Sequence, residues 1–328
     1  MKVLVTGGGG FLGSHIVKEL VARGDEVVTL NRNHYVSLEH PNIKQHQGCI
    51  SDIDQVIAAA NGCNAIIHTA AKAGVWGPFE EYHQANVIGT RNIITACRRL
   101  DIPKLVYTSS PSVVFDGIDQ EGVDETAPIP TNFQAFYPQT KAAAEQLVLK
   151  AKSEKLAVVA LRPHLIWGPG DNHLAPRIIA RAHRLRLIGG GRKKIDAVYI
   201  DNAVKAHLLA LDNLSQDAPC NGKAYFVTNH EPWPMADMIN GILKAANIPT
   251  ISKSIPYRFA YSLSDKIEIL YRLFRIKKEP PLTRFMVLQL GTAHWFNNQA
   301  AIRDLGYQPE ITMAQGFTKL AQSFSENL

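Results

Sequence analysis

The chain has few of the residue patterns that mark secreted or metal-binding proteins. It has four cysteines in 328 residues and none of them shows CxxC spacing, which indicates reduced thiols rather than a disulfide framework. Its 12 histidines include no His-Glu-x-x-His pair, the helical arrangement that binds zinc in many metalloenzymes. We therefore expect neither structural disulfides nor a metal site.

Long apolar runs are also missing. No run approaches the ~18 residues that a membrane-spanning helix needs. The first apolar stretch, residues 3–5, is too short for the apolar region of a secretion signal. Hydrophobic residues make up 46% of the chain and charged residues 20%, as in a globular protein with a sizeable core. We expect a cytoplasmic protein without a transmembrane segment.

The net charge is +6 at pH 7, and the basic residues are spread along the chain. They lack the interleaved aromatic residues of a nucleic-acid binder, so we expect no nucleic-acid partner. A positive surplus suits an anionic cofactor and an acidic substrate.

Short β-branched segments alternate with helical stretches in the first half of the chain. The pattern predicts strands at 3–5, 27–30, 65–68, 105–108 and 158–161, and helices near 14–23, 52–60, 85–100 and 138–152. Such alternation indicates parallel βαβ units and an α/β fold with a Rossmann-type doubly wound sheet. From Trp167 onward, glycine and proline breakers make the pattern irregular.

A glycine run follows the first expected strand and precedes the first expected helix, with the spacing Gly-x-x-Gly-x-x-Gly. The first glycine permits a tight turn, the second lets a pyrophosphate approach the backbone, and the third lets the helix pack closely on the strand. The helix N-terminus then holds the phosphates. We therefore expect a dinucleotide site formed by Gly7, Gly10, Phe11, Leu12 and Gly13.

Tyr137 and Lys141 lie four residues apart in an expected helix, where positions i and i+4 share one face. A lysine ammonium beside a phenol favours the phenolate, so we expect Lys141 to lower the pKa of Tyr137 from its ordinary ~10. Tyr137 then becomes a usable general acid and base.

These motifs follow one another in an order that resembles the extended short-chain dehydrogenases/reductases. The segments that carry this resemblance are the glycine run, His68–Ala71, Asn86–Thr90, Tyr107–Ser110, the Tyr137/Lys141 pair, Leu161–Pro163 and Tyr199–Asn202. Within that superfamily, residues 108–115 and 280–285 look like the 3β-hydroxysteroid dehydrogenase branch. Residues 68–77 resemble bacterial reductases that act on 2-alkyl-3-oxoalkanoates in long-chain olefin biosynthesis.

The resemblance implies two domains. We expect a dinucleotide-binding domain at 1–166 and a mainly substrate-binding lobe at 167–328, with segments near 195–228 returning to the first domain. It also implies a catalytic group of Ser110, Tyr137, Lys141 and Asn86. Ser109 and Ser112 stay open as alternatives to Ser110, and Asn86 either supports the lysine through water or caps a helix.

Cofactor choice rests on the end of the second strand, where an acidic residue would bind the ribose 2′-hydroxyl of NAD. That position is Asn31, followed by Arg32, which favours the 2′-phosphate of NADPH and leaves NAD as the alternative. The small residues Ala70 and Ala71 and the later Pro163 are expected to border the cofactor.

The resemblance implies NADPH-dependent reduction of a long-chain 2-alkyl-3-oxoalkanoate, a β-keto acid, to the 3-hydroxy acid by a homodimer. The alternatives are a 3β-hydroxysteroid or sterol dehydrogenase, a sugar-nucleotide epimerase or dehydratase, and a non-catalytic nucleotide-binding subunit. Phe115 stands where sugar epimerases usually have tyrosine, which disfavours a sugar nucleotide.

Apolar residues between 258 and 275 fall on one helical face, at Phe259, Leu263, Ile267, Leu270 and Phe274. A core-facing stripe is the first interpretation. One alternative is a lid, in which these residues would form an apolar wall over the substrate. The other is an edge that touches a membrane, a multienzyme partner or another subunit. Lys72 either meets a substrate carboxylate or is solvated.

Overall fold

The computed structural model describes residues 1–326. Seven parallel strands form its main sheet, in the order β12-β7-β5-β4-β1-β2-β3. Their bounds are β1 Lys2–Thr6, β2 Glu26–Asn31, β3 Ile43–Gln47, β4 Ala65–His68, β5 Lys104–Thr108, β7 Ala157–Pro163 and β12 Lys223–Val227. The predicted Rossmann-type fold is confirmed, and all five predicted strands are present.

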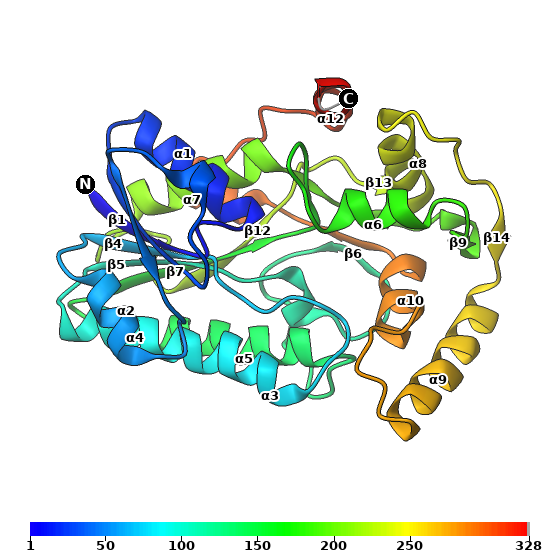
Figure 1. Cartoon of the computed structure of the whole chain (residues 1–328), viewed down its shortest axis with the longest axis horizontal. Helices are drawn as coiled ribbons and strands as arrows, with labels where there is room; N and C mark the ends of the chain where they lie inside the picture. Colours follow the sequence, from blue (N-terminus) through cyan, green and yellow to red (C-terminus); the bar gives the residue numbers. More distant parts are fainter. Residues whose placement is uncertain (327–328) are drawn as a thin grey trace.

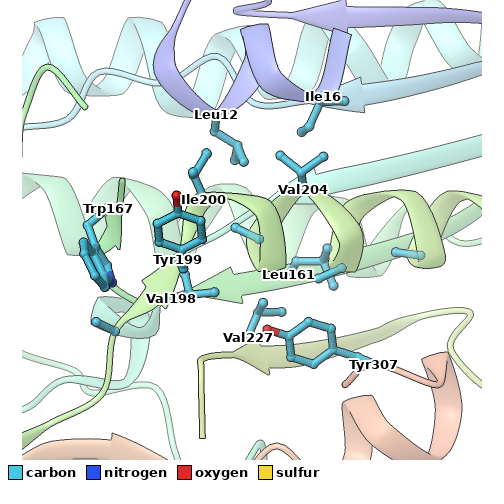
Figure 2. Packing of buried hydrophobic residues seen from close by; sticks show 14 of the residues in the cluster. Leu12, Ile16, Leu161, Trp167, Val198, Tyr199, Ile200, Val204, Val227 and Tyr307 are labelled. Carbon is cyan, nitrogen blue, oxygen red and sulfur yellow. The ribbon is translucent and has the colours of Figure 1, made fainter. Parts of the chain in front are cut away.

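Helices cover both faces of this sheet, which explains why its central strands are apolar on both sides. On one face lie α1 (Phe11–Ala22) and α7 (Ile200–Asn213), and on the other lie α2 (Ile53–Ala60), α4 (Gly89–Arg99) and α5 (Phe136–Lys150) (Figure 1). Figure 2 shows Leu12 and Ile16 of α1 facing Ile200 and Val204 of α7. This packing fixes α1, and with it the glycine run, above the sheet.

The helix that carries Asn86 begins earlier than the sequence pattern predicts. It starts at Phe79 with α3 (Phe79–Tyr82), continues through a π-helical segment at His83–Ile88, and ends in α4. Such π-helical segments occur often at functional sites. The expected start near residue 85 is therefore wrong by more than one turn.

Most of the remaining elements form a smaller lobe beside the sheet (Figure 1), whereas α11 (Gln299–Leu305) packs on α7 and β12. The lobe's four-stranded sheet has the order β13 (Trp233–Pro234), β10 (Lys194–Ile195), β15 (His294–Phe296) and β6 (Gln120–Val123). Two further strand pairs are β8 (Ile166–Trp167) with β11 (Val198–Tyr199) and β9 (Leu187–Ile188) with β14 (Ser254–Ile255).

The remaining helices and the short 3-10 turns complete the chain. The helices are α6 Leu174–Arg181, α8 Met235–Ala245, α9 Tyr257–Leu273, α10 Arg284–Gly291, α11 Gln299–Leu305 and α12 Met313–Glu326, and the 3-10 turns are Val36–Leu38, Pro111–Val114 and Gly189–Gly191. Across residues 1–326, no helix combines the length and the apolar character needed to cross a membrane.

Candidate active site

The predicted site residues gather where parallel strands end. Gly7 follows β1, Ala70 follows β4, Ser110 follows β5, and Pro163 closes β7. The sheet order reverses between β1 and β4, because β2 and β3 extend on one side and β5 and β7 on the other. Ligands of open parallel sheets bind in the crevice at this switch point, outside the carboxyl ends of the strands.

The glycine run makes a tight turn that other residues could not adopt. Gly7 has φ +72°, and its carbonyl oxygen accepts a hydrogen bond of 2.9 Å from the N–H of Gly10. A Cβ at Gly13 would overlap the Gly7 carbonyl oxygen, and one at Gly7 would lie 2.9 Å from Cα of Ala70. The turn therefore packs directly on the chain that leaves β4.

The N-terminus of α1 has the arrangement that a pyrophosphate needs. Its N-cap is Gly10, which offers no side chain, and the first intrahelical bond runs from the N–H of Ser14 to the carbonyl of Gly10 at 2.8 Å. The N–H groups of Phe11, Leu12 and Gly13 precede that bond, so no residue of the helix itself satisfies them. They suit the oxygens of a dinucleotide phosphate.

Asn31 has a structural role that the sequence analysis missed. Its side chain is buried, its Oδ1 accepts a 2.9 Å hydrogen bond from the N–H of Gly9, and its Nδ2 donates to Oγ1 of Thr29 at 3.1 Å. It thus ties the glycine run to the end of β2 without placing a carboxylate there. The next residue, Arg32, is exposed at the same edge.

Tyr137 and Ser110 meet at the end of β5. Tyr137 lies in the first turn of α5, with its phenol close enough to the Ser110 side chain for the two to interact. Burial raises the pKa of Tyr137, and the polar side chain of Ser110 opposes that rise. The expected lowering of this pKa by Lys141 is wrong for the structure, because the net shift is upward and Lys141 is not among its causes.

Lys141 is buried against the same strand end. Its Nζ donates to the Thr108 carbonyl at 2.6 Å and lies 4.2 Å from the ring centroid of Tyr107. Burial lowers the pKa of Lys141 to about 7, and the negative charge of Glu145 opposes that shift. The ammonium is therefore directed at a backbone oxygen of β5, one helical turn from Tyr137.

The three candidate serines are placed differently. Ser110 Oγ accepts a 3.2 Å hydrogen bond from the N–H of Ser112, and the two hydroxyls lie 2.9 Å apart. Ser109 Oγ is buried and has no hydrogen-bond partner among the described residues. Of the three described serines, Ser110 is the one whose side chain lowers the pKa of Tyr137, which favours it as the partner of the phenol.

Asn86 clamps the loop that follows β4. Its Oδ1 accepts from the N–H of Lys72 at 2.7 Å, and its Nδ2 donates to the Lys72 carbonyl at 3.1 Å and to Oγ1 of Thr140 at 3.0 Å. Thr140 adjoins Lys141 in α5. The N-cap alternative is wrong, because Asn86 lies inside the π-helical segment.

An apolar cluster lies beyond the strand ends and includes Phe115, Phe285 and Leu288. Tyr257 and Tyr261 of α9 pack against it, together with Val75 from the loop after β4. The cluster combines residues from both halves of the chain, and Ala135, which also packs against it, lies two residues before Tyr137.

Two buried histidines link Pro163 to this cluster, and the sequence analysis missed both. His164 follows Pro163 at the end of β7, and its Nε2 lies 2.8 Å from Nδ1 of His294. Nε2 of His294 lies 2.6 Å from the Gln289 carbonyl, which can only accept, so His294 donates there and accepts from His164. Burial lowers the pKa of both, that of His294 to about 4. The pair is uncharged at neutral pH, and His294 packs on Phe115.

Comparison with known proteins shows the family of this chain. Residues 4–256 match the 3-beta hydroxysteroid dehydrogenase/isomerase family. The chain belongs to that family. Its resemblance to the 3β-hydroxysteroid dehydrogenase branch, expected from the motif order, is thereby confirmed.

Two relatives of high coverage carry the names of a reductase and a dehydrogenase. The 2-alkyl-3-oxoalkanoate reductase of Stenotrophomonas maltophilia is 48% identical over 98% of this chain and 99% of its own. The sterol-4-alpha-carboxylate 3-dehydrogenase, decarboxylating, of Mus musculus is 33% identical over 98% and 91%. MoeE5 in complex with UDP-glucose and NAD superposes with a TM-score of 0.77 over 100% and 99% at 21% identity, which supports the fold. As a 3-beta hydroxysteroid dehydrogenase/isomerase family member with reductase and dehydrogenase relatives, the chain is an oxidoreductase.

Two substrate-side expectations for this family member need correction. The stripe between 258 and 275 does not face the core, since Phe259 is 60% exposed and Phe274 68%. Its residues also do not wall the apolar cluster, because Tyr257 and Tyr261 supply the α9 contacts there. Lys72 is paired with Glu81 at 2.8 Å, and its side chain is 35% exposed; its contact with a substrate carboxylate stays a prediction.

Proposed function

We propose that this chain reduces the ketone of a long-chain 2-alkyl-3-oxoalkanoate to a 3-hydroxy acid, using NADPH. The observation that carries the proposal is the placement of Ser110 and Tyr137 beside buried Lys141, at the strand ends next to the glycine run. The nicotinamide, when bound, supplies the hydride. The glycine run and the N-terminus of α1 would hold its phosphates, while Ala70, Ala71 and Pro163 border the path between them and Tyr137.

In this proposal two side chains act on the carbonyl oxygen of the ketone. Ser110 donates a hydrogen bond to that oxygen, and Tyr137 donates the proton that completes the alcohol. Loss of this proton makes Tyr137 a phenolate, and the Lys141 ammonium one turn away then favours the charged form. Asn86 positions the Lys72 loop and α5 relative to each other through backbone and Thr140 contacts.

The apolar cluster supports a substrate with a hydrocarbon body. The cluster's buried side chains, Phe115, Phe285 and Leu288, have no carboxylate or amide that could bind the hydroxyls of a sugar. The Stenotrophomonas maltophilia relative carries the name of a β-keto acid reductase. A sterol dehydrogenase is the second candidate, supported by the 33% identity to a mouse enzyme of that class. Both substrates place one ketone or alcohol on an apolar body.

A chain-length series tests the substrate. Each methylene buried in the site contributes up to ~0.8 kcal/mol, so kcat/KM should rise several-fold per methylene until the site is full. We expect short β-keto acids to be poor substrates. The measurement is steady-state kinetics with 3-oxo acids of increasing length, with a sterol and a UDP-sugar alongside.

The variants Phe285→Ser and Leu263→Asp sharpen this test. Phe285 belongs to the apolar cluster and Leu263 points away from it, so only Phe285→Ser should weaken the length dependence in vesicle-free buffer. A flat response of the unaltered enzyme to chain length, with strong sterol turnover, would favour the second candidate.

Cofactor preference is tested at Arg32. We expect Arg32→Ala to weaken NADPH binding about tenfold or more and NADH binding little, because only NADPH carries a 2′-phosphate for the guanidinium. Lys44→Ala removes another exposed cation near β2 and is the control. Dissociation constants from fluorescence titration measure the effect, and equal losses for both cofactors would show that Arg32 does not read the phosphate.

A further inference from the structure

The helix α9 turns its apolar face outward. Of the twelve large hydrophobic residues that are exposed within residues 1–326, seven lie in α9 and the turn after it. These seven, which we name the α9 ridge, are Phe259, Leu263, Ile269, Leu270, Leu273, Phe274 and Ile276. Their exposed fractions reach 70% at Leu273 and 68% at Phe274. A cluster of this kind marks an interaction surface rather than a scatter of single apolar residues.

The inward face of α9 is small and polar, the reverse of an ordinary surface helix. Its buried residues are Ala260, Ser264 and Glu268. Glu268 accepts a 2.7 Å hydrogen bond from the N–H of Arg284, the first residue of α10, and pairs with the Arg284 side chain at 3.3 Å. A carboxylate at a helix N-terminus is favourable. Glu268 thus sets the rotation of α9, and that rotation directs the ridge to solvent.

The ridge is flanked by positive charge. Residues 257–279 contain six basic and three acidic residues. All three carboxylates are paired with arginine: Asp265 and Glu268 with Arg284, and Glu279 with Arg177. The six basic side chains, at positions 258, 266, 272, 275, 277 and 278, belong to exposed residues. An apolar strip bordered by exposed cations is complementary to an anionic lipid surface.

We propose that the α9 ridge docks the protein on the surface of an anionic bilayer, with the apolar side chains among the acyl chains and the flanking cations at the headgroups. A second copy of the chain is a poorer occupant, because a symmetric contact would bring the two positive borders together. No helix in residues 1–326 is suited to spanning a membrane, so the contact is peripheral.

Docking would bring the substrate side of the molecule to the lipid. Tyr257 and Tyr261 reach from the same helix into the apolar cluster. Nε1 of Trp76, in the loop after β4, donates to the Ile276 carbonyl at 3.3 Å, and its ring packs on Tyr271. An apolar substrate then has a short route from the bilayer. This consequence rests on the proposed function, whereas the docking itself is measured without substrate.

Vesicle flotation tests the docking. The unaltered chain is mixed with vesicles of phosphatidylcholine alone, or of phosphatidylcholine with roughly one third phosphatidylglycerol, at low and high salt. We expect at least tenfold tighter binding to the anionic vesicles, weakening as salt rises. Leu270→Asp combined with Phe274→Asp should reduce that binding at least tenfold, and the matched control Val36→Asp combined with Ile118→Asp, at positions 75% and 64% exposed outside α9, should not.

Charge-reversal variants distinguish the effect of the cations beside the ridge on vesicle binding from the effect of the protein's net charge. Lys277→Glu with Lys278→Glu should also reduce binding at least tenfold, while Lys18→Glu with Lys44→Glu makes the same change in net charge elsewhere and should not. Thermal unfolding confirms that each variant is folded. Equal binding of the ridge and control variants, or equal binding to both vesicle types, would overturn the proposal. So would a dimer that ridge variants dissociate while vesicles go unbound, since a second copy would then be the occupant. Ketone turnover in vesicle-free buffer reports on the proposed function separately.

Discussion

Replacing Tyr137 with phenylalanine is expected to lower turnover by about 100-fold or more and to leave NADPH affinity nearly unchanged. The substitution removes one hydroxyl, and a lost general acid costs about two to four orders of magnitude in rate. Because the ring remains, packing at the start of α5 is preserved. Single-turnover kinetics and NADPH titration measure the two effects separately.

The matched control is Tyr271→Phe, which removes a hydroxyl from α9, outside the group formed by Ser110, Tyr137 and Lys141. It should keep full turnover in vesicle-free buffer. Ser110→Ala should lower turnover more than Ser109→Ala, because Ser110 is the one of the two described serines whose side chain influences the pKa of Tyr137. Retained activity in Tyr137→Phe would remove the basis of the proposed mechanism.

Local patterns predicted the parts of the site that are local in sequence. The glycine run needs seven consecutive residues, and Tyr137 and Lys141 need one helical turn, so spacing alone brought each set together. The five strands found from their β-branched runs are buried in the structure. β3 was missed because Lys44, Gln45, His46 and Gln47 form a polar segment at the sheet edge.

Local patterns could not predict contacts between residues that are far apart in the sequence. His164 and His294 are 130 residues apart, and no spacing rule joins them. The helix was expected to begin near Asn86, yet Pro78 followed by Glu80 and Glu81 is a signal for the earlier start that the structure shows.

The α9 ridge shows a different limit. Periodicity predicted an apolar face between 258 and 275 that shares four residues with the ridge and omits Ile269 and Leu273, and it does not say which way such a face points. The direction depends on Glu268, whose partner Arg284 belongs to another helix. A buried carboxylate that caps α10 therefore overrides the usual rule that the apolar face turns inward.

The second large effect is expected in stability, at the buried ion pair between Glu145 of α5 and Arg162 of β7. Arg162 donates two hydrogen bonds to Glu145, at 2.9 and 2.6 Å. The Glu145 side chain is 0% exposed and the Arg162 side chain 5%. The guanidinium also lies 5.1 Å from the ring centroid of Phe226 on β12. The pair thus joins α5, which carries Tyr137 and Lys141, to two strands of the sheet.

We expect Glu145→Ala to lower the free energy of unfolding by about 3–5 kcal/mol, because it leaves the Arg162 charge buried without its partner. Nη1 of Arg162 has no hydrogen-bond partner among the described residues even with Glu145 present, so little is available to replace the carboxylate. Replacing both residues, as Glu145→Leu with Arg162→Met, should recover most of the loss, since neither charge is then buried.

The control is Lys155→Ala, which breaks an exposed ion pair with Asp101. The side chains of Lys155 and Asp101 are 85% and 71% exposed, so this variant should lower the free energy of unfolding by at most about 1 kcal/mol. Urea unfolding of the four proteins measures these differences, and a loss in Glu145→Ala no larger than that in Lys155→Ala would show that the buried pair does not hold α5 to the sheet.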